Sequence, residues 1–344
     1  MAFQRNVWYM AGWAEELSAG QLLSRTILNE PIVFYRLQSG EPAALFDRCP
    51  HRFAPLSAGS QVGDELQCGY HGLKFDCGGA CVSNPHGPVP KAAVVAPYRV
   101  VERYGILWVW MGEFAKADLA TIPDLSQPYA AAPASQSRGY LPTKCHYQLI
   151  VDNVADLSHA DFLHPVSLGG VFTKTRPQVE EQGDTVRITW LSENTPALPV
   201  YDMFMPTPGQ PVDLCTEVQW HAPGVMPLNI FCTPTGRPRE EGIGTHNVHI
   251  VTPETETTSH YWFWLTRNYR PDDAAMTSKR QEIMFGVFTN EDKPMLEKQQ
   301  RRLGSQELME LKPVLLPIDA GSMRIRRIHD RLIHAQQVGA PTLS

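Results

Sequence analysis

Two short stretches near the start of the chain decide what its first domain can be: CPH at residues 49–51 and CGYH at residues 68–71. Each supplies one cysteine and one histidine, and 16 residues separate the two stretches. Zinc sites that use both residue types usually keep cysteine with cysteine and histidine with histidine in the sequence. A mixed-ligand [2Fe–2S] cluster binds two thiolates on one iron and two imidazoles on the other. Because each stretch offers one ligand to each iron, the pattern favours the cluster, with ligands Cys49, His51, Cys68 and His71.

The residues around these ligands agree with a tight, buried site. Gly63, Gly69 and Gly72 permit backbone conformations that other residues avoid, so we expect compact loops. Cys77 and Cys81 follow closely, but the cluster already has four ligands, and we interpret these two thiols as spectators. The other three cysteines are expected to be buried in the core, as free cysteine usually is: Cys145, Cys215 and Cys232.

The general properties exclude several classes of protein. The chain has 344 residues, enough for one large or two ordinary domains, and its formal net charge of −6 argues against a nucleic-acid-binding protein. No apolar run reaches the ~18 residues that span a bilayer, and the first residues lack the pattern of a signal peptide. We therefore expect no membrane association and a cytoplasmic location. In that compartment, an odd set of seven cysteines favours metal binding over disulfides.

Composition and periodicity divide the chain into two parts. The first ~110 residues contain short strand-like runs broken by Gly and Pro, which is typical of a small β domain. Residues 113–137 are rich in Ala, Pro and Ser and indicate a linker. We place the domain boundary so that residues 1–118 form the cluster domain and residues 119–344 form the catalytic domain. The strand-like runs of the first part are 31–37, 43–46 and 105–110.

The second part predicts an α+β domain. A helix is expected around residues 149–163, and a long helical tract over 273–303 is interrupted by Pro294. Between them lie alternating or aromatic-rich runs that predict an antiparallel sheet. The fold class is therefore α+β, an all-β domain followed by a sheet covered by helices, similar to a helix-grip fold. The predicted strands of the sheet are 185–191, 214–222, 228–233, 247–252 and 260–266.

A second group of metal-ligand residues lies in the predicted helix at 149–163. Asp152, Asp156 and His159 stand at i, i+4 and i+7 and would share one helix face. His164 precedes Pro165, which disfavours helical geometry and allows the chain to bring a second imidazole back. Two imidazoles and one carboxylate with open positions make the facial triad of Fe(II) oxygenases. A solvated helix face or a zinc site fits this stretch equally well, but an electron-transfer cluster in the same chain favours iron as the destination of its electron.

The remaining carboxylate ligand is not fixed by periodicity. Glu282, Glu291 and Asp292 are the candidates on the later helical tract, and the last two face the same apolar side. These observations leave the choice between Glu291 and Asp292 open.

The motifs together resemble the Rieske oxygenase family. CPHR at 49–52, CGYHG at 68–72 and DNVADLSHADFLH at 152–164 carry the resemblance. Further similarity to the branch of vanillate O-demethylase, toluenesulfonate methyl-monooxygenase and dicamba O-demethylase extends over nearly the whole chain. It rests on NVWYMAGW (6–13), VERYGILWVW (101–110), TPETETTSHYWFWLTRN (252–268) and IDAGSMRIRR (318–327).

The resemblance implies a role for each candidate residue. It assigns the cluster to the four Cys and His ligands named above, and the mononuclear iron to His159, His164 and Asp292. Asp156 resembles the family's bridging carboxylate, which would join His159 to His71 of a neighbouring subunit in a head-to-tail homotrimer. Asn153, on the same stretch, is assigned with Asp156 to the catalytic machinery.

The implied function is that of the oxygenase component of a Rieske monooxygenase. The chain has no G-x-G-x-x-G after a strand, so electrons from NAD(P)H would come through a separate reductase, with or without a ferredoxin. O2 would be the co-substrate, and hydroxylation of a methoxy group would demethylate a small aromatic substrate. Hydroxylation of an aryl methyl, an N-methyl or the ring is the alternative. A non-catalytic Rieske electron carrier is a different-class alternative, but such carriers need only the first ~110 residues.

Four residues are candidates for the substrate pocket. Asn229 and His249 match positions where the dicamba O-demethylase pattern holds a substrate carboxylate, which predicts a methoxybenzoate-like carboxylate as substrate. Ile283, with Met284 beside it, would line the same cavity. The alternative is that the first two are strand residues satisfied within the sheet and that the helix residues are ordinary core. The basic segment at 324–327 is either a docking site for an acidic reductase or ferredoxin or a solvated run of charge.

Overall fold

The computed structural model describes residues 3–205 and 207–338 and has the expected α+β fold. The chain forms two compact units. One comprises Arg5–Ile122, and the other begins at Pro123 and includes the short N-terminal segment that ends at Gln4. The units therefore divide between Ile122 and Pro123, whereas composition suggested residue 118. No helix of the described residues is long and apolar enough to cross a membrane.

The first unit consists of small antiparallel sheets, as its short apolar runs predicted. One sheet has the order β1-β11-β10, with strands Val7–Trp13, Ile106–Met111 and Val100–Arg103. The next has the order β2-β3-β4-β9, with strands Leu23–Ile27, Glu30–Arg36, Pro42–Phe46 and Pro97–Tyr98. The third has the order β5-β6-β7-β8, with strands Ser60–Val62, Glu65–Gln67, Lys74–Phe75 and Cys81–Ser83.

The second unit is built on one seven-stranded antiparallel sheet of order β12-β18-β17-β16-β15-β14-β13. Six strands follow one another as a meander, and β12 joins the edge beside β18. Strict alternation of buried and part-buried residues along β15 shows one face turned to the core. The strands are Gln136–Thr143 (β12), Gln178–Gln182 (β13), Thr185–Thr195 (β14), Val212–His221 (β15), Val225–Pro234 (β16), Ile243–Pro253 (β17) and Ser259–Thr266 (β18).

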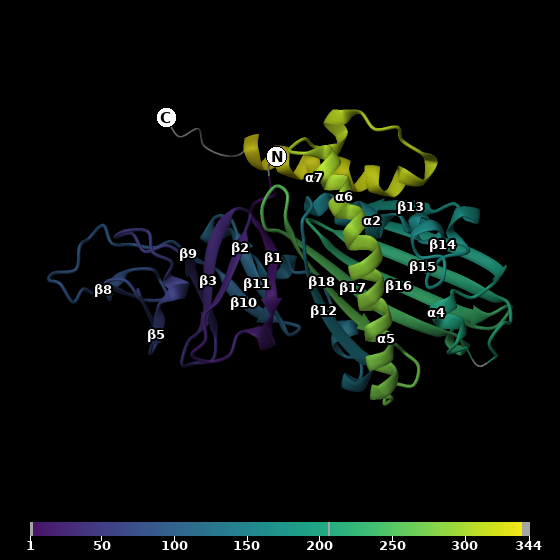
Figure 1. Cartoon of the computed structure of the whole chain (residues 1–344), viewed down its shortest axis with the longest axis horizontal. Coiled ribbons are helices and arrows are strands. Elements are labelled where there is room, and N and C mark those ends of the chain that lie inside the picture. The colour runs from purple at the N-terminus through teal and green to yellow at the C-terminus, as the bar shows by residue number, and fades with distance from the viewer. Residues whose placement is uncertain (1–2, 206, 339–344) are drawn as a thin grey trace. The chain divides into compact units, whose positions relative to one another are not determined.

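Helices cover one face of this sheet (Figure 1). α2 packs against β15 and β17, α5 against β12, and α7 against β14 and α2. The helices are Ser126–Tyr129 (α1), Tyr147–Ala155 (α2), Ala160–Leu163 (α3), Pro199–Asp202 (α4), Ala274–Val287 (α5), Lys293–Leu303 (α6) and Ala320–Val338 (α7).

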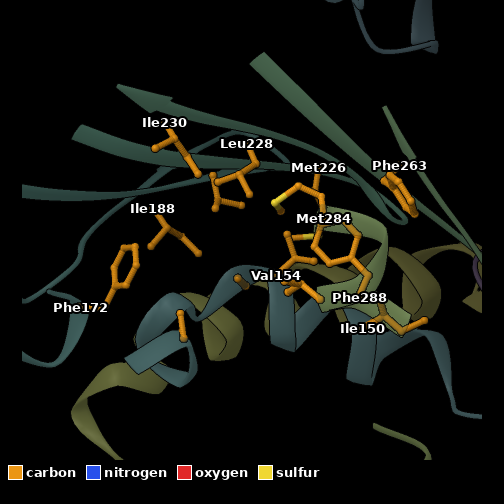
Figure 2. Close-up of a cluster of buried hydrophobic side chains, with 14 of the residues drawn as sticks. Ile150, Val154, Phe172, Ile188, Met226, Leu228, Ile230, Phe263, Met284 and Phe288 are labelled. Atoms are coloured by element: carbon orange, nitrogen blue, oxygen red, sulfur yellow. The ribbon is translucent and has the colours of Figure 1, made fainter. Parts of the chain in front are cut away.

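The main core lies between these helices and the sheet. Figure 2 shows Met226, Leu228 and Ile230 pointing from β16 toward Val154 of α2 and Met284 of α5. All five side chains are buried, and fully burying a side chain of this size stabilises the fold by about 1.5–3 kcal/mol. Two helices that carry site residues, α2 and α5, are therefore fixed to the sheet by apolar packing.

Three features differ from the sequence-based expectations. The linker at 113–137 contains 3-10 turns and α1, and it leads into β12, which the Pro- and Ser-rich composition concealed. β13 was not predicted either. The expected single helix at 149–163 is broken, because the backbone of Asp156 is extended (φ −121°, ψ 100°) and the chain continues as a 3-10 turn and α3.

Candidate metal centres and active-site cavity

The two Cys/His stretches form two neighbouring loops in the first unit, one after β4 and one between β6 and β7. The two cysteines lie together, and so do the two histidines, although the members of each pair are far apart in the sequence. The Cys49 and Cys68 thiols are buried and hydrogen-bond to each other, and the rings of His51 and His71 lie with centroids 4.5 Å apart. A Rieske cluster needs this grouping of two thiolates and two imidazoles, so the donor set fits the cluster.

The two loops share one backbone pattern. In each, the cysteine N–H donates to the carbonyl five residues later, and the N–H four residues later donates back to the cysteine carbonyl. These bonds are Cys49 to Ala54 (2.8 Å), Phe53 to Cys49 (2.9 Å), Cys68 to Leu73 (2.8 Å) and Gly72 to Cys68 (3.0 Å). The residue that closes each turn has a positive φ, +60° at Phe53 and +74° at Gly72. Glycine adopts this conformation freely, whereas a bulky residue is held there only by the surrounding bonds.

His159, His164 and Asp292 come together in the second unit. One ligand atom from each lies within 4.8 Å of the others. The Nε2 atoms of His164 and His159 are 3.0 Å and 3.5 Å from Asp292 Oδ1. Two imidazoles and one carboxylate, arranged around one point beside a cavity, fit a facial-triad iron site.

The outer nitrogen of each imidazole is held by an oxygen. His159 Nδ1 donates to the main-chain carbonyl of Asp156, and His164 Nδ1 donates to Glu291 Oε2 at 2.6 Å. Both rings therefore present Nε2 to the same point. Metal-binding histidines usually have such a partner, which fixes the ring orientation and the tautomer.

A widened turn in the late helical tract gives the three carboxylate candidates, Glu282, Glu291 and Asp292, different positions relative to the histidines. Residues Phe288–Asp292 form a π-helix between α5 and α6, so the expected interruption lies before Pro294, which falls in the first turn of α6. Proline clashes with the carbonyl four residues earlier in a regular helix, and a widened turn relieves this clash. In the wider turn Asp292 points to the two Nε2 atoms and Glu291 to the far side of His164, whereas Glu282 is exposed on α5.

The electrostatics of the triad favour an ionised aspartate. Burial alone would raise the pKa of the Asp292 carboxyl, but the His159 and His164 imidazoles that contact it hold the pKa at about 2. Burial would likewise lower the pKa of His164, and the carboxylates of Asp292 and Glu291 raise it instead. The site therefore supplies a carboxylate ligand at any physiological pH.

Asn153 and Asp156 lie beside the triad, as the sequence resemblance implied. Asn153 Nδ2 is 3.1 Å from Asp292 Oδ1 and 3.3 Å from His159 Nε2. The carboxylate of Asp156 caps the following 3-10 turn by accepting the N–H of Ser158 at 2.9 Å. This local bond competes with the helix and explains why α2 ends here.

Asp152 borders the same groove as Asp156 and His159, but it does not belong to the group of three metal-ligand side chains. It pairs with Arg326 of α7, whose Nε lies 3.1 Å from both carboxylate oxygens. Arg326 also donates to Gln148 and is buried. The basic segment at 324–327 is therefore not a uniform surface run, since one of its arginines joins α7 to α2.

A cavity opens beside the triad; Figure 2 shows several of the apolar side chains that line it. Its walls are mostly apolar, with Val154, Leu228, Ile230, Met284 and Phe288 among the lining residues. The loop after α3 also contributes to the lining. Asp161 holds this loop by accepting hydrogen bonds from the backbone N–H groups of residues 170–173.

The structure places the predicted pocket residues differently with respect to this cavity. His249 lines it and accepts or donates a 2.6 Å hydrogen bond with the Tyr261 hydroxyl. Asn229 does not line the cavity, because it faces the opposite side of the sheet and bonds His246 at 2.9 Å. Of the two predicted helix residues, Met284 lines the cavity and Ile283 packs against the core beside it.

Sequence reasoning missed Asn247, which lines the cavity from the same strand face as His249. A signal was available. Side chains two residues apart on a strand share a face, so the Asn-Val-His run at 247–249 could have paired these two residues.

An open groove of about 1030 Å³ lies on the other side of the triad. Asp156 and His159 border it, together with residues of α6 and of the segment before α7. Several large apolar side chains are exposed in or near this part of the unit, among them Phe162, Val166, Val314 and Leu315.

These sites and this fold define the oxygenase component of a Rieske non-haem iron system. Residues 7–98 match the Rieske [2Fe-2S] domain, and residues 143–335 match the vanillate O-demethylase oxygenase C-terminal domain. The chain belongs to this family of Rieske monooxygenase oxygenase components. As such it is an oxidoreductase that carries a [2Fe–2S] cluster and a mononuclear iron, uses O2, and depends on a separate source of electrons.

Known relatives match over nearly their whole length. The oxygenase component of dicamba O-demethylase from Stenotrophomonas maltophilia is 38% identical over 96% of this chain and 98% of its own. That of chloroacetanilide N-alkylformylase from Rhizorhabdus wittichii is 34% identical over 97% of each chain. The crystal structure of dicamba monooxygenase bound to 3,6-dichlorosalicylic acid superposes with a TM-score of 0.91 at 36% identity, covering 98% of this chain and 99% of that chain. A dicamba monooxygenase structure with non-haem iron and dicamba has a TM-score of 0.82 at 34% identity, covering 99% of this chain and 100% of that one.

Proposed function

We propose that this chain O-demethylates a small aromatic methyl ether. The observation that carries the proposal is the facial triad at the edge of a buried, mostly apolar cavity, whose walls suit the ring of an aromatic substrate with its methoxy carbon directed to the metal. Relatives whose names specify O-demethylation of dicamba and vanillate support the reaction type.

In this proposal, Cys49, His51, Cys68 and His71 hold the cluster, and the triad holds the iron. The bound metals supply electron storage and O2 activation. The protein's own part is orientation: the Asp156 carbonyl and the Glu291 carboxylate fix the two imidazoles, and the apolar walls exclude water from the methoxy group.

In the proposed reaction, one oxygen atom of O2 is inserted into a C–H bond of the methoxy group. The aryl methyl ether, O2, two electrons and two protons give a hemiacetal and water. The hemiacetal then collapses to a phenol and formaldehyde. The two electrons come from NAD(P)H through a partner reductase, with or without a ferredoxin, which is consistent with a cytoplasmic location.

We further propose a head-to-tail homotrimer in which the cluster of one subunit serves the iron of the next. His51 is exposed beside the cluster, and Phe53 and Tyr70 around it are 67% and 60% exposed. The groove beside Asp156 and His159 is the matching surface, since it is open and has exposed apolar residues near it. Asp156 would bridge the partner subunit's His71 to His159.

A formaldehyde assay tests the reaction. The holoenzyme with a surrogate reductase is given methoxybenzoates, methoxyphenols and methoxybenzamides, and we expect at least one to release one formaldehyde per O2 consumed. N-Dealkylation is the second candidate, because a 34% identical relative is named an N-alkylformylase. Turnover of N-methyl or aryl-methyl compounds without any formaldehyde from the ethers would replace O-demethylation by that alternative.

A further inference from the structure

Among the described residues that line the cavity, Asn247 is the one with a buried side-chain polar atom that has no hydrogen-bond partner. It is 4% exposed, and its Nδ2 donates to Thr245 Oγ1 at 3.2 Å. Thr245 Oγ1 is itself held by the Tyr201 hydroxyl at 2.6 Å. The remaining amide atom, Oδ1, is buried and has no hydrogen-bond partner among the described residues. A buried carbonyl oxygen without a partner costs about 1–3 kcal/mol, so a ligand that donates to it would recover this energy.

His249 lies two residues further along the same face of β17 and lines the same cavity. Burial lowers the pKa of this imidazole to about 4, so the ring is neutral at physiological pH. A phenol is the better acid and an imidazole the better base, so Tyr261 donates to His249 Nδ1. The proton of the neutral ring is then on Nε2, which makes that nitrogen a donor.

The side chains that line the cavity beyond the metal ligands therefore combine one acceptor and one donor. Among the described residues that line it there is no lysine or arginine. A carboxylate offers acceptors only, so it would repel Asn247 Oδ1 and remain without a paired cation from the protein. A phenolic hydroxyl or a primary carboxamide offers both a donor and an acceptor.

We propose that Asn247 anchors the substrate and, with His249, selects an aromatic ring with a neutral hydroxyl or carboxamide over one with a carboxylate. This inference rests on the proposed function for the identity of the cavity as the substrate site. Asn247 takes the substrate-binding role that the sequence suggested for Asn229, which lies on the opposite face of the sheet. The expected substrate changes accordingly from a methoxybenzoate to an uncharged methoxyarene.

Binding to the holoenzyme in the absence of O2 tests the inference without turnover. 4-Methoxybenzamide and 4-methoxybenzoate have nearly the same shape, and their dissociation constants are measured by calorimetry. We expect the amide to bind at least about tenfold more tightly, the equivalent of one to two hydrogen bonds. Asn247→Leu should weaken amide binding about tenfold and change benzoate binding less than about twofold. Asn229→Leu, the matched control on the other face of the sheet, should change neither.

Asn247→Asp guards against a folding defect in the leucine variant, because it keeps the side-chain size and the acceptor oxygen. It should retain amide binding and weaken benzoate binding further. Tighter binding of the benzoate by the unmodified protein, equal losses for both ligands in Asn247→Leu, or no binding of either ligand would each overturn the inference. Failure of the proposed function is distinguishable, since it would appear as amide binding with the expected Asn247 dependence but no formaldehyde from any ether.

Discussion

Replacing Glu291 with glutamine tests how the second imidazole of the triad is held. Glu291 Oε2 lies 2.6 Å from His164 Nδ1, and the substitution keeps the side-chain length and one acceptor oxygen but removes the charge. Loss of such a partner typically lowers metal affinity by about 10–100-fold, or about 1.4–2.8 kcal/mol. The Glu291 side chain is 32% exposed and glutamine still accepts a hydrogen bond, so we expect the lower end, about tenfold.

The assay is a chelator competition on the purified protein. The visible spectrum measures the cluster, and the iron of the triad is the total iron minus the iron of the cluster. Glu282→Gln is the matched control, because Glu282 lies on the preceding helix and is exposed. The Glu291→Gln variant should lose mononuclear iron at about tenfold lower chelator concentration and keep an unchanged cluster spectrum. Equal iron retention in the two variants would refute the reasoning.

Three further predictions concern the triad and its supports. Asp292→Asn should remove one of three irons per chain while the cluster spectrum stays; unchanged iron content would exclude Asp292 as a ligand. Asp161→Asn should lower stability at pH 7 by about 1–2 kcal/mol in urea titrations. Burial alone would raise the pKa of Asp161, but hydrogen bonds from residues 170–173 lower it, so this difference should be complete above about pH 4 and shrink as the pH falls further. Asp152→Ala should cost about 3–5 kcal/mol because it leaves the Arg326 guanidinium buried and unpaired, and a double variant with Arg326→Met should recover most of that loss.

The sequence predicted the fold well where residue type alone determines structure. Apolar alternation marked most strands of the large sheet, and the Cys and His spacings marked both metal neighbourhoods. It failed at the break after α2, because the helical period continues through Asp156 and only the competing bond from Ser158 ends the helix.

The pocket residues show a second limit. Which face of a strand a residue occupies depends on register, and a shift of one position moves a side chain to the other face. Asn229 and His249 lie on adjacent strands, β16 and β17, and matching them to a family pattern could not reveal that they point to opposite sides. Asn247 and His249 lie on one strand, so their shared face follows from spacing alone.

The π-helix at Phe288–Asp292 makes the iron site sensitive to chain length as well as to residue type. Deleting one residue within it would restore a regular helix, in which each residue turns by about 100°. Glu291 bonds His164 Nδ1 and Asp292 bonds His164 Nε2. After the deletion, the two carboxylates could no longer reach both of these nitrogens. A change of chain length in this segment would therefore disturb the carboxylates, whereas substitutions on the strand side of the cavity, at Asn247 and His249, leave the backbone of the triad unchanged.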